Sequence, residues 1–340
     1  MSFWDNKKVL VTGGAGFIGS HLVEDLVRER AIITVADNLE RGSIENLRRV
    51  SKEIIMYITD LRNYDNCVKI CRSQNIVMNL AAEEANSRYV YANKRRIFEN
   101  NMLIQMNVLK AACESKVDKF LFVSSSCIYS CDVNVPTMES ESENAFPSKS
   151  ISVLGWVKRM GEELSQHYAE ESHMSVSIAR LYSTFGARDN FDLNTCHLIA
   201  AIIKQVVDNY NPITVWGSSE QRRAFVYVKD AVKCLKFIVE RSTSPEPVNV
   251  GHDCAIAISD LVNKIQNIVG VHNQVNYKRS NRYGCAIRAA DVSKLSRITN
   301  GFIPTSEIDT KLMEVINYYK YIKRSIEQGD VDLASYYEGE

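Results

Sequence analysis

The stretch VTGGAGFIGSH, residues 11–21, sets four glycines between a β-branched run and a helical pattern. Gly13, Gly16 and Gly19 form a G-x-x-G-x-x-G turn, whose backbone can approach a pyrophosphate and present a helix N-terminus to it. The next strand-like run ends at Asp37, whose carboxylate can accept hydrogen bonds from a ribose diol and repels a 2′-phosphate. Glycines also form plain turns, but this order of elements predicts a dinucleotide site that prefers NAD to NADP, although Arg41 is nearby.

Apolar runs of strand length alternate with helical stretches through the first half of the chain. The runs KKVLVTGG, IITVADN, IIMYITD, IVMNLAA, KFLFVSSS and VSIARLY are separated by segments such as HLVEDLVRER and NNMLIQMNVLKAACES. This order predicts an α/β fold with a Rossmann-type doubly wound parallel sheet. We expect an NAD-binding domain over residues 1–181, a smaller α/β C-terminal substrate domain over residues 182–327 with some chain crossing back, and a polar tail over residues 328–340.

The composition excludes several classes of protein. With 41 basic and 41 acidic residues, no net field draws the chain to nucleic acid or to an anionic membrane. No apolar signal segment opens the sequence and no run reaches the roughly 18 apolar residues that span a bilayer, so we expect a cytoplasmic protein. The nine cysteines, including the close pairs Cys67/Cys71 and Cys127/Cys131, lack metal-ligand spacing. We therefore expect reduced thiols and no metal site.

Further motifs accompany the glycine turn, namely DNLERG, NLAA, NNMLIQMNVLKAA, SSSCIY, GWVKRMGEE, RRAFVYVKD and VNVG. With them the chain resembles the extended short-chain dehydrogenase/reductase family of nucleotide-sugar epimerases and dehydratases. It is most similar to the GDP-mannose 3,5-epimerase branch, through SSSCIYS, GWVKRMGEE and GARDNFDLNTCHLIAAII. The resemblance implies an NAD-dependent enzyme that acts on a nucleotide-diphosphate sugar, a GDP-sugar being favoured, through a keto-sugar intermediate.

The resemblance also implies which residues contact the cofactor and the substrate. Cofactor contacts are expected from Gly13, Gly16, Phe17, Ile18, Gly19, Asp37, Asn38, Arg41, Asp60, Leu61, Leu80, Ala81, Ala82, Asn101 and Lys158. Substrate contacts are expected from Glu83, Ser126, Ser183, Arg223 and Arg288. The two arginines match positions that clamp the diphosphate, with a surface ion pair as the alternative for each. For Asp60 the alternative to an adenine contact is a turn after a strand.

In this family a tyrosinate takes the hydroxyl proton of the sugar, while a lysine lowers the tyrosine pKa and anchors the nicotinamide ribose. A Ser or Thr hydroxyl holds the reacting oxygen. By match to this pattern, Ser125 has the hydroxyl role and Lys158 the lysine role. Cys127 falls where the branch carries a cysteine acid/base, and His197 matches its second acid/base region. The alternatives are a small buried thiol for Cys127 and a cap or packing residue for His197.

The tyrosine position, however, holds Leu154, one helical turn before Lys158. The register is fixed because GWVKRMGEE follows without a gap, and a leucine has no proton to exchange. A second Tyr-x-x-x-Lys, from Tyr319 to Lys323, is interpreted as a surface coincidence in a terminal amphipathic helix.

Other departures agree with the loss of the tyrosine. The segment EEANSRYV replaces a glycine-rich substrate loop and adds Glu83 and Glu84 beside the expected diphosphate. Ser183 stands where the family prefers Asn, and Ala187 where it prefers Pro. The dinucleotide half of the pattern is intact while the reacting half has changed.

Three functions remain open. The first is a nucleotide-sugar epimerase or related oxidoreductase whose proton transfer has moved to Cys127, Tyr129, Glu83 or a water held by Lys158. The second is a non-catalytic NAD-binding protein that regulates or partners an active relative. The third is a non-redox acid/base enzyme that uses Cys127 and His197 and keeps NAD for structure. We predict the first, because the binding residues are retained.

Two helices predict a homodimer. The helices that begin near Arg95 and near Leu154 carry apolar residues at helical spacing on more than one face. One sheet cannot cover all of these faces, and the family pairs such helices across a two-fold axis into a four-helix bundle.

Overall fold

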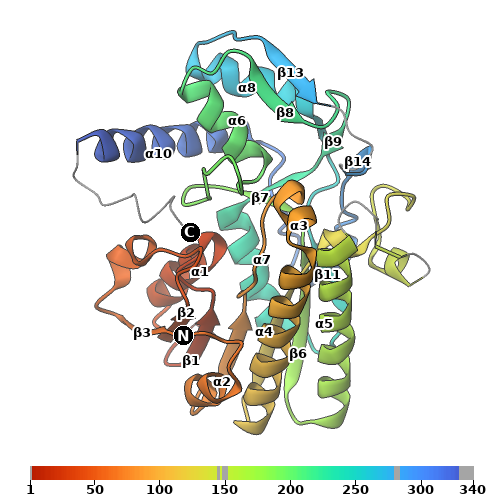
Figure 1. The fold of residues 1–340 in the computed structure, drawn as a ribbon. Coiled ribbons are helices and arrows are strands. Elements are labelled where there is room, and N and C mark those ends of the chain that lie inside the picture. The colour runs from red at the N-terminus through yellow and green to blue at the C-terminus, as the bar shows by residue number, and fades with distance from the viewer. Residues whose placement is uncertain (1, 144–145, 148–151, 279–283, 329–340) are drawn as a thin grey trace.

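The computed structural model describes residues 2–143, 146–147, 152–278 and 284–328, so that most of the expected polar tail lies outside it. Its centre is a seven-stranded sheet in the order β11-β6-β5-β4-β1-β2-β3, in which every neighbouring pair is parallel (Figure 1). The strands are β1 (Lys8–Thr12), β2 (Ile32–Asp37), β3 (Ile54–Ile58), β4 (Ile76–Asn79), β5 (Lys119–Ser125), β6 (Ser175–Leu181) and β11 (Pro247–Val250). The predicted Rossmann-type α/β fold is confirmed.

Helices cover both faces of the sheet because its strands are apolar on both sides. Along β1, Val9 and Val11 pack in one core with α1 and α7, whereas Leu10 between them packs in another core with α2 and α4. These layers contain α1 (Phe17–Arg28), α7 (Val228–Arg241) and α9 (Ser293–Ile298) on one face, and α2 (Tyr64–Cys71), α4 (Lys94–Glu114) and α5 (Ser152–Glu171) on the other. α4 and α5 lie side by side (Figure 1).

The smaller part of the chain has its own core, which touches the sheet domain at Phe17 and Ile18, where α1 begins. This core is built from α6 (Leu198–Val207), α8 (Ile258–Val269), α10 (Asp309–Glu327), β8 (Ile213–Trp216) and β13 (Val275–Lys278). The remaining short elements are η1 (Ile44–Val50), α3 (Ser87–Ala92), η2 (Ser126–Ile128), η3 (Glu139–Ser142), β7 (Ser183–Phe185), β9 (Arg222–Arg223), β10 (Phe225–Tyr227), β12 (Ile256–Ala257) and β14 (Ile287–Arg288). The chain crosses back at β11, which pairs with β6 in the main sheet.

The structure contains a disulfide bond, so the expectation that all cysteines are reduced is wrong. Cys131, in the loop after β5, is bonded to Cys285, which lies two residues before the start of β14. The two residues are 154 positions apart in the sequence, and only the crossing of the chain brings their Cα atoms to 4.8 Å. Cys67 and Cys71 are free and buried, and burial raises the pKa of both thiols to about 12.

The Tyr319 to Lys323 pair is not a surface feature, which corrects the interpretation of the sequence. Tyr319 is 4% exposed, because α10 packs its ring against the core of the smaller part. Its hydroxyl accepts a hydrogen bond from Lys204 and donates one to Asp208, each at 2.9 Å. Lys323 also donates to Asp208, at 2.8 Å. These contacts fasten α10 to α6. Among the described helices, none combines the length and apolarity needed to cross a membrane.

Candidate cofactor and substrate site

The glycine turn is folded so tightly that two of its glycines have no room for a side chain. Gly13 has a φ of +66°, and a Cβ on it would lie 2.9 Å from the backbone nitrogen of Ala81 in the loop after β4. A Cβ on Gly19 would lie 2.1 Å from the carbonyl oxygen of Gly13. α1 begins directly after Gly16, which supplies no side-chain cap to the first-turn N–H groups. This backbone is therefore open to a pyrophosphate, and the turn fits NAD.

Asp37 ends β2 beside the turn and holds it in place. One carboxylate oxygen accepts a hydrogen bond from the backbone N–H of Ala15 at 3.0 Å, and the other accepts one from Leu39 at 2.9 Å. Burial raises the pKa of this carboxyl, and the backbone N–H groups oppose that rise. A carboxylate has about four acceptor positions, and the backbone N–H groups of Ala15, Gly16 and Leu39 take three, which leaves one for a ribose hydroxyl.

Asp37→Ala is expected to weaken NAD binding by about 1.5 to 3 kcal/mol, the scale of a hydrogen bond to a charged group. The variant loses the ribose acceptors and the carboxylate that holds Ala15. Calorimetric titration of the purified protein with NAD measures the change. Asp65→Ala, which removes an exposed carboxylate on α2, is the matched control. A dissociation constant within twofold of the unmodified protein would contradict the assignment of Asp37.

The polar candidates beyond Asp37 already have partners within the protein. Asp60 accepts hydrogen bonds from the Arg62 guanidinium at 2.8 to 3.0 Å, and this bonding lowers its pKa. It also accepts the backbone N–H of Arg62 at 2.9 Å, which is the arrangement of a turn-forming aspartate. Arg41 lies over the ring of Tyr89 in α3, 5.0 Å from its centroid. Asn38 accepts a hydrogen bond from the N–H of Glu40 at 3.1 Å.

The hydroxyl and lysine candidates lie together at the end of β5. Ser125 is the last residue of β5, and its Oγ accepts a hydrogen bond from the backbone N–H of Cys127 at 3.2 Å. Lys158, one turn into α5, donates to the carbonyl oxygen of Val123 at 2.8 Å. Burial lowers the pKa of this ammonium. An ammonium has three N–H donors, so Lys158 keeps donors for a ligand.

Leu154 is not exposed to the site but packs in a small apolar cluster. It is 5% exposed and lies with Val90 of α3 and Ile97 of α4, against the half-buried Cys127. Val90 belongs to the segment that replaces the glycine-rich loop of the family pattern. The lost tyrosine and the changed loop therefore meet in one cluster, and the leucine serves to pack α3 onto α5.

Arg223 and Arg288 lie on neighbouring strands and directly opposite one another. β9 and β14 pair in parallel with these two residues in register. Burial, together with the charge of Arg288, lowers the pKa of Arg223 to about 10. Arg288 donates to the carbonyl oxygen of Ser126 in η2 at 2.6 Å. Arg223 donates to the carbonyl oxygens of Arg222 and Ala286, and among the described residues neither guanidinium forms an ion pair.

Comparison with known proteins assigns the family. The model of the NAD dependent epimerase/dehydratase family matches residues 9–251. The chain belongs to this family. GDP-mannose 3,5-epimerase 1 of Oryza sativa subsp. indica is 27% identical over 344 residues, which covers 98% of this chain and 88% of the relative. UDP-glucuronic acid decarboxylase 1 of Xenopus tropicalis is 27% identical over 317 residues, covering 93% and 73%.

Solved structures of epimerases have the same fold as this epimerase/dehydratase family member. UDP-N-acetylglucosamine 4-epimerase from Methanobrevibacter ruminantium, in complex with UDP-N-acetylmuramic acid, superimposes with a TM-score of 0.85 at 27% identity. The match covers 94% of this chain and 99% of the epimerase. Epimerase Mth375 from Methanothermobacter thermautotrophicus superimposes with a TM-score of 0.87 at 22% identity, covering 96% and 95%.

Not all candidates of this family member meet at the glycine turn. The Glu83 carboxylate accepts hydrogen bonds from Arg96 at 2.7 Å and Asn100 at 2.7 Å, so it is turned toward α4 rather than free for a substrate. His197 is exposed at the start of α6, and Ser183 is exposed at the start of β7. Asn101 holds the backbone of Glu83 by accepting from its N–H at 2.8 Å and donating to its carbonyl oxygen at 2.9 Å.

The sequence motifs did not predict a buried polar network that joins β6 to α5. Arg180 of β6 forms an ion pair with Glu162 of α5 at 2.7 Å, with both side chains at most 6% exposed. Arg180 also donates to the hydroxyl of Tyr129 at 2.8 Å, and Ser124 bonds to Glu162. Residue spacing is the one sequence feature that points to Glu162, because it follows Lys158 by four residues and therefore lies on the same face of the helix.

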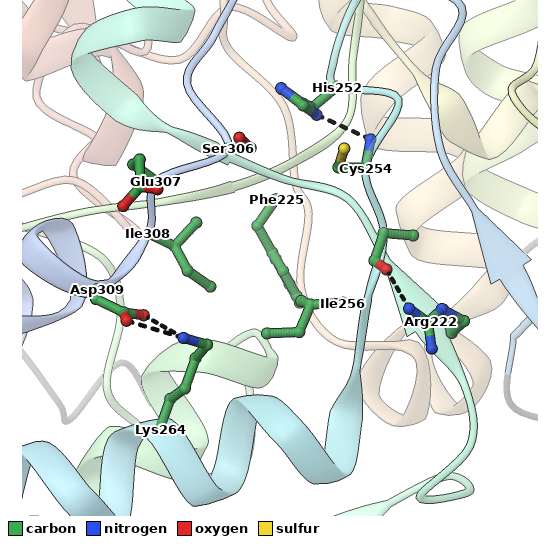
Figure 2. Close-up of a pocket in the computed structure, with 11 residues that line it drawn as sticks. Arg222, Phe225, His252, Cys254, Ile256, Lys264, Ser306, Glu307, Ile308 and Asp309 are labelled. Atoms are coloured by element: carbon green, nitrogen blue, oxygen red, sulfur yellow. Dashed lines mark hydrogen bonds and ion pairs between the residues drawn. The ribbon is translucent and has the colours of Figure 1, made fainter.

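A pocket of about 350 Å³ lies on the other side of β9 from the paired arginines. Figure 2 shows Arg222, the neighbour of Arg223 in β9, beside this pocket with His252, Cys254 and Lys264. Successive residues of a strand point to opposite sides, which separates Arg222 from Arg223. Lys264 is bonded to Asp309 at 2.8 Å, and His252 Nδ1 accepts the N–H of Cys254 at 2.8 Å. No residue expected from the sequence to bind cofactor or substrate lines this pocket.

Proposed function

We propose that this protein is an NAD-dependent nucleotide-sugar epimerase that acts through a keto-sugar intermediate, with proton transfer by a group other than the missing tyrosine. The observation that supports it most is the pair Arg223 and Arg288, which lie in register on neighbouring strands, with Arg288 bonded to Ser126 directly after β5. Two adjacent arginines without a carboxylate partner suit a diphosphate, which the guanidinium fork binds by paired hydrogen bonds.

The residues around β5 have separate roles in this proposal. NAD, when bound at the glycine turn, supplies the acceptor for a hydride from the sugar carbon. Ser125 holds the reacting sugar oxygen by a hydrogen bond, and Lys158 holds the nicotinamide ribose with the donors that Val123 leaves free. Leu154 stays packed in its apolar cluster with Cys127 and takes no part in proton transfer.

A GDP-sugar is the favoured substrate class. The support is the similarity to the rice GDP-mannose 3,5-epimerase, which covers 98% of this chain. The similarity to a UDP-glucuronic acid decarboxylase has the same identity of 27%, so UDP-sugars belong in the same test.

The test is to add GDP-mannose, UDP-glucose and UDP-glucuronic acid separately to the NAD-loaded protein and to record NADH absorbance and the sugar products. Transient NADH with an epimerised sugar is the expected result. Product without transient NADH would favour the non-redox enzyme with structural NAD. Tight NAD binding with no product from any sugar would favour a non-catalytic NAD-binding protein that partners an active relative. This is the second candidate because Leu154 stands in place of the tyrosine.

We also propose a homodimer built on α4 and α5. Apolar side chains are exposed on both helices, Leu103 at 45% and Met106 at 48% on α4, Trp156 at 37% and Met160 at 44% on α5. These neighbouring helices together form an apolar face that a second copy would cover by helix packing across a two-fold axis.

Light scattering at micromolar concentration is expected to give twice the chain mass of 38.5 kDa. The double variant Met106→Glu, Met160→Glu places charges in the middle of the proposed interface and is expected to give the monomer. Met313→Glu, at a residue of α10 that is 50% exposed, is the control that keeps the dimer. A monomer in the unmodified protein would refute the dimer.

A further inference from the structure

The loop after β4 carries two adjacent carboxylates that point to different surroundings. Asn101 fixes the backbone of Glu83 on both its N–H and its carbonyl oxygen, at 2.8 and 2.9 Å. The Glu83 side chain is held by Arg96 and Asn100 of α4. The Glu84 carboxylate lies instead within electrostatic range of Cys127 in η2 and Lys158 in α5.

The position of this loop brings Glu84 to the reaction centre. β4 and β5 are neighbours in the parallel sheet, so the loops that follow them leave the same edge side by side. The negative charge of Glu84 raises the pKa of both Lys158 and Cys127. At Lys158 it opposes the larger effect of burial, which lowers the pKa. At Cys127 it adds to the effect of burial, which raises the pKa. Among the described residues, the half-buried Glu84 carboxylate forms no hydrogen bond or ion pair.

The other groups that could replace the tyrosine are engaged or inert. The hydroxyl of Tyr129 is bonded to Asn249 at 2.7 Å and to Arg180 at 2.8 Å, and burial keeps the phenol protonated by raising its pKa. Burial also raises the pKa of the Cys127 thiol, which disfavours the thiolate. Glu83 is held on α4 by Arg96. Glu84 is left as the one carboxylate of this loop that is free to receive a proton.

We propose that Glu84 is the catalytic acid/base of this protein and takes the place of the tyrosine that Leu154 removes. The inference rests on the proposed function and deepens it. The same segment, residues 83–90, supplies Val90 to pack over Leu154 and Glu84 to replace the lost phenol. Lys158 keeps its role of holding the nicotinamide ribose.

The step balances without a further reagent. In the oxidation, the sugar O–H bond breaks and its proton moves to an oxygen of Glu84. The C–H bond of the same carbon breaks with its electron pair, which leaves as hydride to bound NAD, and a C=O bond forms. The sugar is oxidised and NAD is reduced. In the return step the hydride comes back to carbon and Glu84 gives its proton to the oxygen, so the protein ends as it began.

The first experiment tests the position of Glu84 without any substrate. The rate at which iodoacetamide alkylates Cys127 is measured over a range of pH by mass spectrometry of the peptide that contains it. Glu84→Gln removes a negative charge near the thiol and is expected to move the titration of Cys127 to lower pH. Glu53→Gln, at an exposed carboxylate before β3 and so at the opposite edge of the sheet, is expected to leave it unchanged. An unchanged titration in Glu84→Gln would overturn the placement.

The second experiment tests proton transfer by Glu84. It uses whichever of GDP-mannose, UDP-glucose and UDP-glucuronic acid produces NADH with the unmodified protein. Glu84→Gln is expected to lower the rate of NADH formation about 100-fold or more, with an unchanged dissociation constant for NAD. Glu84→Asp, which keeps a carboxylate at this position, is expected to restore part of the rate. If Glu84→Gln keeps the full rate while Cys127→Ser abolishes it, Glu84 is excluded and the enzyme function stands. If no sugar gives NADH although the Cys127 titration shifts, the function fails and the acid/base role fails with it.

Discussion

Replacing Glu162 with alanine is expected to destabilise the folded protein by about 3 to 5 kcal/mol, because it leaves a buried arginine without its counterion. The Arg180 and Glu162 side chains are 4% and 6% exposed and lie 2.7 Å apart, so water cannot replace the lost carboxylate. The same variant removes the acceptor of Ser124 in β5. The expected result is a large fall in the urea concentration at the midpoint of unfolding.

The matched control for this prediction is the next residue of the helix. Glu163→Ala removes an exposed carboxylate, 70% accessible, whose ion-pair partner among the described residues is His167 at 3.8 Å. An exposed pair of this kind contributes about 0 to 1 kcal/mol, so the midpoint is expected to stay nearly the same. Equal midpoints for Glu162→Ala and Glu163→Ala would show that the buried pair does not stabilise the sheet domain.

Replacing Arg223 with alanine is expected to weaken binding of the nucleotide sugar by about 1.5 to 3 kcal/mol, which raises its dissociation constant about 10- to 150-fold. The guanidinium of Arg223 makes its hydrogen bonds with backbone carbonyls, one of them to Arg222 at 2.8 Å, and it faces Arg288 on the neighbouring strand. The charge of Arg223 is therefore available to a diphosphate. Calorimetric titration of the NAD-loaded protein with GDP-mannose and with UDP-glucose measures the loss.

Arg222→Ala is the control for this change, since it removes the same charge from the other side of the same strand. Arg222 donates to the carbonyl oxygen of Ala255 at 2.9 Å and lines the pocket of Figure 2. Affinity for the nucleotide sugar is expected to stay within twofold in Arg222→Ala. An equal loss in both variants would indicate a general effect of charge and would remove the support that the arginine pair gives to the proposed function.

The sequence alone determined the sheet domain and the glycine turn. Strand, glycine turn, helix and Asp37 are local features with a fixed spacing, and the close approach of Gly19 to Gly13 lies within the turn itself. The replacement of the tyrosine by Leu154 is likewise visible from spacing, because Lys158 marks the register. Such features can be predicted since they need no knowledge of distant contacts.

The tertiary structure alone decided which side chains meet across the chain. Cys131 and Cys285 are 154 residues apart, and no spacing rule pairs them. Tyr319 is buried because α10 packs on α6, although its helix has an amphipathic pattern typical of a surface. The network of Arg180 and Glu162 joins a strand to a helix that precedes it in the chain.

The clearest difference concerns the two neighbouring glutamates. Their sequence, EEANSRYV, gives Glu83 and Glu84 the same chemistry and the same place in the pattern. Only the contacts of α4 distinguish them, because Arg96, Asn100 and Asn101 hold Glu83 and leave Glu84 without a hydrogen-bond partner among the described residues. Local sequence thus determined where the glycine turn for the cofactor lies. Packing between distant segments decided which of the two carboxylates stays free, because the direction of a side chain depends on the partners that it contacts.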